Sequence, residues 1–454
     1  MSAFALWLYG RGMTAVQPLL RRKLARRALQ EAGYGEAVEE RFGAYTQPSE
    51  KASELVWVHA VSLGETRTAA VLLTALRAQH PGLRILLTHG TATGRAEGAG
   101  LLQAGDVQIW QPWDSPAAVA RFFYHFKPRL GLLMETEVWP CKVAAACARG
   151  VPLVLVNARL SDKSLRRALR VATIALPAFG ALSAVYAQTD DDAQRLLALG
   201  AAVKGVFGNL KFDATPDASQ HAQGAAWRHL VGMPVVMFAS SREGEEGEFL
   251  KQIVPLAQVI RAQEATDLIA TDSAEGAAPR RFKPLIVPRH PQRFNEVQAL
   301  AESRGLSVSR RSSWPAAGPF ESSEAMQADV WLGDSLGEMA LYYGLSSVAL
   351  LGGSFAPLGG QNLIEAAACG CPVVMGPHTF NFLEAAELAE AEGAALRAGD
   401  MGEAVQCAIA LVNEPSALAK AADAGLAFAA RNRGATGRTL VELRGYLLRA
   451  VSYQ

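Results

Sequence analysis

The run LVWVHAVSLGETRTAAVLLTALRAQH, residues 55–80, joins a strand pattern to a helix pattern through a short turn. Residues 55–61 are almost all apolar, which predicts a buried strand, and the apolar residues of 66–80 recur at helical spacing. Residues 62–64, Ser-Leu-Gly, predict the turn between them. A strand that passes through a tight turn into a helix is typical of the βαβ units of a parallel sheet.

Glu65 lies where the predicted strand gives way to the predicted helix. One interpretation is structural, because an acid in the first helical turn is favoured by the helix macrodipole. The other is functional: a catalytic base at the carboxyl end of a parallel strand, where open α/β sheets place their ligands. We expect a carboxylate here to stay ionised, since the dipole favours its charged form, and Gly64 to let backbone and substrate approach closely.

Short apolar runs alternate with helical patterns along most of the chain, with seven candidate strands between residues 54 and 210 and six after residue 232. This pattern predicts an α/β protein with two Rossmann-like domains that face a central cleft. The predicted boundaries are 1–50 for a membrane-associating segment and basic helix, 51–212 for the N-terminal domain, 213–232 for a polar linker, 233–425 for the C-terminal domain, and 426–454 for a C-terminal helix that would pack back on the N-terminal domain.

The composition is that of a folded globular protein. Of 454 residues, 50% are apolar and 19% are charged, and the formal net charge is +1, which argues against a disordered or nucleic-acid-coating protein. The five cysteines are odd in number and lack zinc-type spacing. We therefore expect reduced thiols, as in a cytoplasmic protein.

The first 27 residues combine an aromatic, apolar run with a basic cluster at residues 21–27. A secretory signal would place its charges before the apolar run and end at a cleavage site, and neither feature is present. Arg11, Gln17 and Pro18 interrupt the apolar stretch that a spanning helix needs. The pattern favours a membrane anchor, monotopic or with a single span, beside an anionic cytoplasmic leaflet. The alternative is an ordinary N-terminal helix packed on the domain.

The run VALLGGSFAPLGGQNLIEAAACGCPVVMGP, residues 348–377, places two glycine pairs between a strand and a helix. Glycine-rich backbone beside a helix N-terminus offers unshielded N–H donors to a phosphate. Asn362 would cap that helix, and Glu365 would face the cleft and could bind ribose hydroxyls. A plain Asn-x-x-Glu capping box also explains this residue pair, but it does not explain two glycine pairs in one loop.

Charged and polar residues that could bind a nucleotide follow other predicted strands as well. Arg289 follows one predicted strand, where an arginine can hold a phosphate in bidentate fashion, and Glu338 and the run 238–246, FASSREGEE, follow two more. Each turn alone is ordinary α/β turn chemistry, and together they predict a nucleotide site. In the N-terminal half of the chain, Glu135 and Glu137 lie at the end of a strand that is predicted to be buried. These acids therefore need charge or hydrogen-bond partners, or they have a functional role.

Several cations accompany these acids, namely Arg159, Lys163 and Lys211. They suit an anionic substrate, although solvated surface charges are the default explanation. The sequence has no P-loop, no HExxH motif and no Cys/His zinc spacing, and nothing in it requires a metal.

The chain resembles the Kdo transferases of lipopolysaccharide assembly, which form glycosyltransferase family 30 and have the GT-B fold. The resemblance rests on runs spread over residues 55–380: WVHAVSLGET, METEVWP, NARLSDKS, GNLKF, VPRH and GGSFAPLGGQNLIE. It implies inverting, metal-independent transfer of 3-deoxy-D-manno-oct-2-ulosonic acid (Kdo) from CMP-Kdo to the lipid A precursor lipid IVA. It implies no cofactor and no nucleic-acid partner, and a place at the cytoplasmic side of the inner membrane of a Gram-negative cell.

The resemblance also implies roles for individual residues. Glu65 corresponds to the family's base, and Glu135 and Lys211 correspond to its transition-state stabilisers. The implied CMP contacts are Pro288, Arg289, Leu336, Gly337, Glu338, Asn362, Leu363, Ile364 and Glu365.

Two positions depart from the family pattern. Gln361 and Arg242 stand where the family usually has histidine, which puts in doubt any imidazole role at these positions. The alternatives to a Kdo transferase are another GT-B glycosyltransferase, a sugar-nucleotide epimerase, and a non-catalytic membrane-surface scaffold. A scaffold has no reason to keep both Glu65 and the glycine-rich loop.

Overall fold

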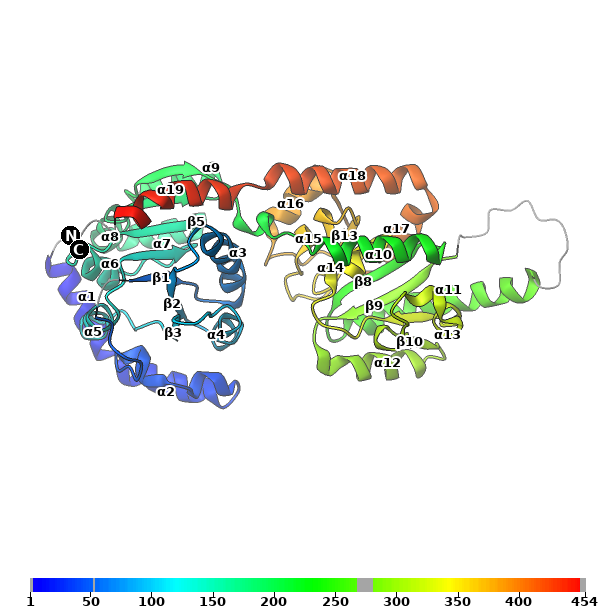
Figure 1. The fold of residues 1–454 in the computed structure, drawn as a ribbon, viewed down its shortest axis with the longest axis horizontal. Helices are drawn as coiled ribbons and strands as arrows, with labels where there is room; N and C mark the ends of the chain where they lie inside the picture. Colours follow the sequence, from blue (N-terminus) through cyan, green and yellow to red (C-terminus); the bar gives the residue numbers. More distant parts are fainter. Residues whose placement is uncertain (1–2, 52–53, 268–280, 450–454) are drawn as a thin grey trace. The chain divides into compact units, whose positions relative to one another are not determined.

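The computed structural model describes residues 3–51, 54–267 and 281–449. The chain forms two compact units, which are described separately: unit 1 is Met1–Asp213 with Asn432–Gln454, and unit 2 is Ala214–Arg431. The C-terminal helix α19 (Ala435–Arg449), drawn in red in Figure 1, therefore belongs to the same unit as the blue and cyan N-terminal elements.

Within the described residues, unit 1 contains a sheet of seven parallel strands in the order β3-β2-β1-β4-β5-β6-β7. The strands are β1 (Leu55–His59), β2 (Arg84–His89), β3 (Val107–Trp110), β4 (Leu130–Met134), β5 (Leu153–Ala158), β6 (Ala184–Ala187) and β7 (Val203–Val206). The strand order reverses between β1 and β4. That junction is a topological switch point, where open α/β sheets bind ligands at the carboxyl ends of the strands.

Both faces of this sheet are buried at its central strands, so β1, β4 and β5 are almost entirely apolar rather than alternating. Trp57 of β1 packs on one face against Phe122 and Phe123 of α5, and its neighbours Val56 and Val58 pack on the other face in the core formed with α3 and α19. The described helices of unit 1 are α1 (Ala3–Ala15), α2 (Gln17–Ala28), α3 (Leu63–Gln79), α4 (Ala92–Ala99), α5 (Pro116–Phe126), α6 (Pro140–Cys147), α7 (Asp162–Arg170), α8 (Ala172–Gly180), α9 (Asp190–Ala198) and α19.

Unit 2 contains a second sheet of seven parallel strands among the described residues, in the order β10-β11-β9-β8-β12-β13-β14. Its strands are β8 (Val235–Ser241), β9 (Lys283–Pro288), β10 (Val308–Arg310), β11 (Val330–Leu332), β12 (Val348–Leu351), β13 (Val373–Met375) and β14 (Ala395–Arg397). The order reverses between β8 and β12, which is the switch point of this unit. The sequence predicted six of these strands and missed β14.

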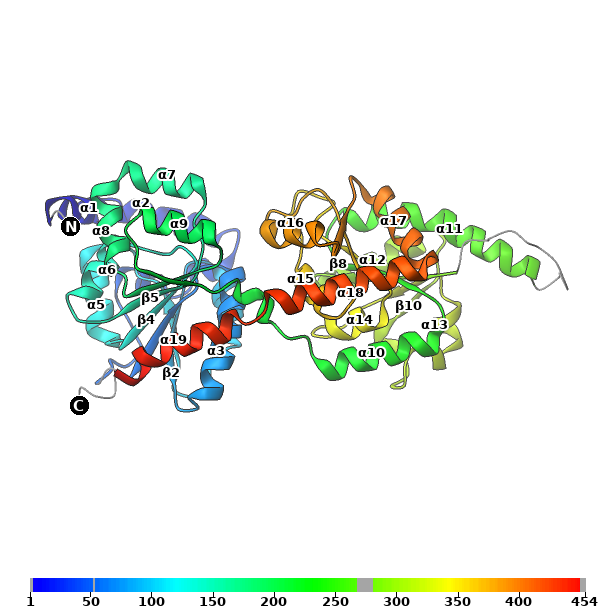
Figure 2. The same ribbon diagram turned by 90° about the horizontal axis from the view of Figure 1, so that it is seen from above.

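The described helices of unit 2 are α10 (Ala218–Val231), α11 (Glu245–Asp267), α12 (Phe294–Glu302), α13 (Ser323–Gln327), α14 (Met339–Leu345), α15 (Leu363–Ala368), α16 (Leu383–Ala391), α17 (Met401–Asn413) and α18 (Pro415–Asn432). One core brings apolar residues of α11, α12 and α17 together with strand residues such as Phe238 and Leu350. In Figure 2, α18 runs along unit 2, where the sequence had placed a domain boundary at residue 425.

Most of the segment predicted as a linker, 213–232, is helix α10. The Asp217 carboxylate caps this helix by accepting the N–H groups of Ser219 and Gln220. Gly224 allows close packing on α14, since a Cβ there would lie 2.1 Å from the carbonyl oxygen of Leu341. The polar composition of the segment therefore describes an exposed helix surface, and the linker prediction is wrong for residues 218–231.

The C-terminal helix α19 packs against α3 and against the 3₁₀ turn η3 (Leu210–Asp213) of unit 1. The Asp213 carboxylate accepts the N–H groups of Gly434 and Thr436, so the end of the first segment of unit 1 holds the start of the second. The segment predicted as one helix from residue 426 therefore divides at residues 433–434 into the end of α18 and all of α19.

The N-terminal helix α1 has two different faces. Leu6 and Tyr9 pack against the core of unit 1, whereas Phe4, Trp7 and Leu8 are 69%, 54% and 57% exposed. No helix in residues 3–51, 54–267 and 281–449 is long and apolar enough to cross a bilayer. The helix thus packs on its domain and also presents an aromatic surface outward.

Candidate functional site

Glu65 opens helix α3 at the switch point of unit 1. Ser62 is the N-cap residue, and its hydroxyl accepts the N–H of Glu65. The Glu65 carboxylate accepts the backbone N–H of Val61 at 2.8 Å and the hydroxyl of Ser62 at 3.0 Å. The capping arrangement therefore fixes the direction of this side chain beside the end of β1.

Burial raises the pKa of Glu65 to about 7, and the nearby carboxylates of Glu135 and Glu137 add to the rise, whereas the bonds from Val61 and Ser62 oppose it. A rise from 4.5 to about 7 corresponds to roughly 3 kcal/mol. A helix dipole contributes only about 0.3–1 kcal/mol. The expectation that the dipole keeps this carboxylate ionised is therefore wrong below neutral pH, because desolvation is the larger effect.

Glu135 and Glu137 follow β4, the strand next to β1 across the switch point. Glu135 has a φ of 56°, a left-handed conformation that L-residues rarely adopt, and its Oε2 lies 3.5 Å from Nε of Arg159. The Oε2 of Glu137 accepts the indole N–H of Trp139 at 2.7 Å. The carboxylates of Glu65, Glu135 and Glu137 thus lie near one another at the carboxyl ends of β1 and β4.

A buried polar cluster lies behind Glu137. His59 Nε2 is 3.9 Å from Oε2 of Glu137, and burial lowers the pKa of His59 well below its usual range. The ammonium of Lys142 donates to Oε1 of Gln111 at 3.0 Å. Burial lowers the pKa of Lys142 to about 8, although the charges of Asp114 and Glu137 oppose that change. The cluster holds a neutral imidazole and a cation beside the acids.

Lys211 lies on η3, after Gly208, whose φ is 85°. The backbone N–H of Lys211 donates to Oδ1 of Asn209 at 3.0 Å. Since η3 packs against α3, Lys211 belongs to the segment that contacts the helix carrying Glu65.

In unit 2, the first glycine pair does not offer free donors to a phosphate. The buried Glu245 carboxylate accepts the N–H groups of Gly353, Phe355 and Ala356. The N–H of Gly352 donates to Ala239, and that of Gly360 donates to the carbonyl of Gly353. The prediction of unshielded donors is therefore wrong for these residues, because the chain supplies its own acceptors.

Arg289 follows β9, and its backbone N–H donates to the carbonyl of Ser241 at the end of β8. Burial raises the pKa of Tyr343, the carboxylate of Glu365 adds to the rise, and Arg289 opposes it. Arg289 and Glu365 therefore both lie near the same buried phenol. Pro288, before Arg289, is the last residue of the buried strand β9.

The other predicted nucleotide contacts have structural roles as well. Leu336 is exposed, and the carbonyl of Gly337 accepts the side-chain amide of Gln220 at 3.0 Å. Glu338 pairs with Arg311 at 3.0 Å. Asn362 caps α15 by accepting the N–H of Ile364 at 3.1 Å. Two further residues of the predicted set, Leu363 and Ile364, are buried.

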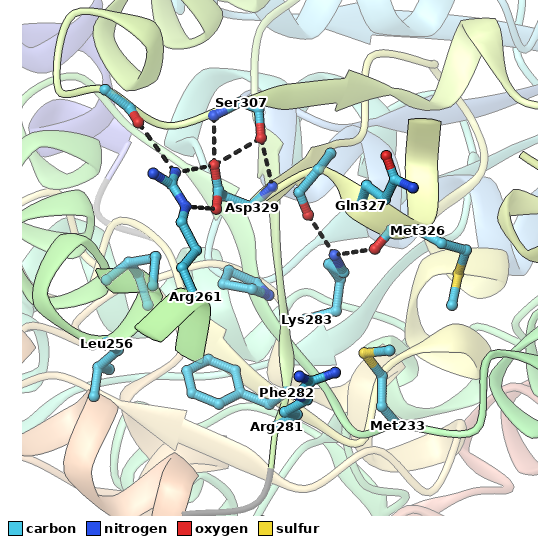
Figure 3. A pocket seen from close by; sticks show the side chains of 15 residues that line it. Met233, Leu256, Arg261, Arg281, Phe282, Lys283, Ser307, Met326, Gln327 and Asp329 are labelled. Atoms are coloured by element: carbon cyan, nitrogen blue, oxygen red, sulfur yellow. Dashed lines mark hydrogen bonds and ion pairs between the residues drawn. The ribbon is translucent and has the colours of Figure 1, made fainter. Parts of the chain in front are cut away.

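A cavity of about 650 Å³ lies at the opposite, amino edge of this sheet (Figure 3). There the ammonium of Lys283 donates to the carbonyls of Met326 and Ala328, and Arg261 pairs with Asp329. Ligands of open α/β sheets bind at the carboxyl ends of the strands, so this cavity is separate from the candidate site.

The sequence predicted the acids at the strand ends and missed their buried support. His59 and Glu245 lie within runs that were interpreted as a whole, and Lys142 and Asp114 lie outside the motifs that the sequence suggests. The signal that could have identified them is a charged or polar residue in an otherwise buried run, which needs a partner.

Comparison with known proteins identifies the family. Residues 36–214 match the family model described as 3-Deoxy-D-manno-octulosonic-acid transferase (kdotransferase). The 3-deoxy-D-manno-octulosonic acid transferase of Bordetella pertussis is 45% identical over 97% of this chain and 99% of its own. That of Haemophilus influenzae is 30% identical over 96% of this chain and 97% of its own.

Solved structures show the fold. A glycosyltransferase from Rickettsia africae matches with a TM-score of 0.52 at 12% identity, over 88% of this chain and 99% of that one. A UDP-GlcNAc 2-epimerase from Neisseria meningitidis matches with a TM-score of 0.51 at 16% identity, over 87% and 100%. They confirm the GT-B architecture, and the near full-length relatives separate this chain from the epimerases. The chain belongs to the 3-deoxy-D-manno-octulosonic acid (Kdo) transferase family.

Proposed function

We propose that Glu65 is the general base with which this transferase moves Kdo from CMP-Kdo to a lipid A precursor. The Glu65 carboxylate takes the proton of an acceptor sugar hydroxyl while the hydroxyl oxygen attacks the anomeric carbon of Kdo. The bond from that carbon to the phosphate oxygen breaks, and CMP leaves with the bonding electrons. Attack opposite to the leaving group inverts the anomeric centre.

The observation that carries this proposal is the raised pKa of Glu65 together with the position of its carboxylate. A general base works best when its pKa is close to the operating pH, and burial raises the pKa of Glu65 to about 7. Its carboxylate lies at the switch point of the sheet, where a substrate is expected. Its hydrogen bonds to Val61 and Ser62 hold it in place for proton transfer.

Glu135 and Lys211 complete the catalytic set in this proposal. The positive charge that develops on the Kdo ring as the phosphate leaves would be stabilised by the Glu135 carboxylate, which lies at the same sheet edge as Glu65. Lys211 would stabilise the negative charge of the leaving phosphate. Electrostatic stabilisation of this type is often the largest catalytic contribution.

CMP is proposed to bind at the carboxyl edge of the sheet of unit 2. Arg289 would hold the phosphate, and Glu365 would accept ribose hydroxyls. The arrangement around Tyr343 supports this placement, because it brings an arginine and a carboxylate of the predicted set together. The remaining contacts would come from Pro288, from the turn 336–338, and from the start of α15.

Replacing Arg289 by Ala should weaken CMP binding about tenfold or more, since a charge-assisted bond to phosphate contributes roughly 1.5–3 kcal/mol. Isothermal titration calorimetry with CMP measures this change, and Glu365→Ala should lower the affinity in the same direction. The matched control is Arg261→Ala, at the amino edge of the same sheet. An unchanged CMP affinity in Arg289→Ala would remove this placement of the phosphate.

We further propose that α1 and α2 hold the enzyme on the cytoplasmic face of the inner membrane. Phe4, Trp7 and Leu8 project from unit 1, and the basic residues 21–23 of the next helix are exposed. Aromatic and apolar side chains beside cations suit an anionic lipid interface. Such a contact would place the site near a lipid acceptor.

The double variant Trp7→Ser with Leu8→Ser should bind anionic phospholipid vesicles at least about tenfold more weakly, because burying one large apolar side chain contributes roughly 1.5–3 kcal/mol. Vesicle co-sedimentation measures the partition. Val441→Ser is the control, since Val441 is an exposed apolar residue of α19. Equal binding of the double variant and the unchanged protein would exclude α1 as the contact.

The function itself is tested by incubating the protein with CMP-Kdo, generated in place, and lipid IVA. Mass spectrometry of the lipid product should show a gain of one or more Kdo residues and release of CMP. Absence of a lipid-linked Kdo product under conditions in which CMP-Kdo persists would contradict the proposed reaction.

A further inference from the structure

Glu245 occupies the same topological position in unit 2 as Glu65 does in unit 1. Glu65 lies in the first turn of the helix after β1, at the junction of β1 and β4. Glu245 begins the helix after β8, at the junction of β8 and β12. Both carboxylates therefore lie at a switch point, where α/β proteins place their ligands.

The two carboxylates have different surroundings. Glu65 accepts one backbone N–H and one hydroxyl. Glu245 is buried, and it accepts four backbone N–H groups: Gly353 at 2.8 Å and Arg242, Phe355 and Ala356 at 3.1 Å each. A carboxylate that already accepts four hydrogen bonds has little capacity left to bind a substrate group.

The four donors come from two loops, so Glu245 joins them. Arg242 lies in the turn after β8, and residues 353–356 lie in the glycine-rich loop after β12. The same loop is bonded to β8 at a second point, where the N–H of Gly352 donates to the carbonyl of Ala239, and a Cβ at Gly352 would lie 2.3 Å from the carbonyl oxygen of Ser240. Gly352 thus permits the close approach, and Glu245 fixes the loop that follows.

The proposed donor contacts lie on either side of this junction. The carbonyl of Ser241, next to Arg242, accepts the N–H of Arg289. On the other side, the N–H of Gly360 donates to the carbonyl of Gly353 at 2.8 Å, directly before the 362–365 segment. A shift of the loop relative to the turn would therefore separate Arg289 from Glu365.

We propose that Glu245 is a positioning residue for the donor: its carboxylate ties the glycine-rich loop to the β8 turn and sets the spacing of the groups that bind CMP-Kdo. This inference rests on the proposed function of unit 2. It assigns to Glu245 the four backbone bonds and no contact with the substrate. Gln at this position keeps the size of the side chain but turns one acceptor into a donor, which faces N–H groups that need an acceptor.

The test compares Glu245→Gln with Asp329→Asn. Asp329 is a matched control, since it also accepts a backbone N–H, that of Ser307 at 2.7 Å, but at the opposite edge of the same sheet (Figure 3). We expect Glu245→Gln to raise the KM for CMP-Kdo and the Kd for CMP about tenfold, equivalent to 1.4 kcal/mol, while the KM for lipid IVA stays within about twofold. Asp329→Asn should leave all three constants unchanged, even where it lowers the unfolding temperature.

A second variant covers the case in which Glu245→Gln does not fold. Glu245→Asp keeps the charge but is one methylene shorter, so it cannot reach both loops, and the KM for CMP-Kdo should rise. The rise should be smaller than in Glu245→Gln, because Asp places no donor against the backbone N–H groups. A folded Glu245→Gln or Glu245→Asp protein with an unchanged donor KM would overturn the inference, as would an equal rise in Asp329→Asn. If the wild-type protein transfers no Kdo, the proposed function is wrong, and this result can be told apart from a failure of the inference about Glu245.

Discussion

Replacing Glu65 by Gln should lower kcat about 10²–10⁴-fold, the usual contribution of a general base, and leave the Kd for CMP unchanged. Gln can still accept the N–H of Val61 and bond to Ser62, but it cannot take a proton from the acceptor hydroxyl. The rate loss therefore reports the missing base rather than a collapsed turn. Transfer is measured as lipid-linked Kdo per unit time, and CMP affinity by calorimetry.

The pH dependence of the unchanged enzyme gives a second readout of the same assignment. Because burial raises the pKa of Glu65 to about 7, kcat should increase as the pH rises through about 7, and this rise should be absent from the residual activity of Glu65→Gln. Glu97→Gln is the control, since Glu97 pairs with Arg67 on the exposed surface of α4. A variant that transfers Kdo at the rate of the unchanged protein would make Glu65 a capping residue only.

The stability of the folded protein should fall as the pH rises, whereas kcat should increase. A carboxyl group whose folded-state pKa exceeds its unfolded value favours folding at low pH, and that contribution is lost as the pH rises from 4.5 through about 7. Above this window the buried charge costs up to roughly 3 kcal/mol. Glu65→Gln is therefore expected to unfold at a higher temperature than the unchanged protein at pH 8, as part of the same experiment.

The fold could be predicted where local patterns are strong. The apolar run 55–61 and the helical spacing of 66–80 predicted β1 and α3, because both faces of the sheet are covered at β1 and the strand is apolar up to its last residue, His59. Strand β14 was missed because it has three residues at the edge of the sheet and is only partly buried. Helix α10 was missed because its packing depends on Gly224 and on a partner far along the chain, α14.

Some features of the candidate site could likewise be predicted from the local sequence, and others could not. The positions of Glu65 and Glu135 follow from the strand ends, which the sequence gives locally. The pKa of Glu65 does not, since it depends on how deeply α3 is packed and on the acids of a neighbouring strand. Nor could the bonds of Glu245 be predicted, because three of their four donors lie more than a hundred residues further along the chain.

The largest effect on stability is expected at Asp114, which supports the acid cluster from behind. Its carboxylate is buried and accepts the N–H groups of Cys141 and Lys142 at 2.9 Å each, as well as the hydroxyl of Tyr9. The N-cap residue of helix α6, Trp139, makes no side-chain capping bond, so Asp114 caps the helix instead. It also compensates the buried ammonium of Lys142.

Replacing Asp114 by Ala should therefore cost about 3–5 kcal/mol in the free energy of unfolding of unit 1, because it removes the larger of the two charges that compensate the buried cation of Lys142. Urea titration measures this cost. Tyr9→Phe removes only one bond to the same carboxylate and should cost about 1 kcal/mol. Adding Lys142→Met to Asp114→Ala should recover part of the loss, since no uncompensated charge then remains. If Asp114→Ala costs no more than Tyr9→Phe, the carboxylate does not compensate Lys142, and the start of α6 after Glu137 is held by packing alone.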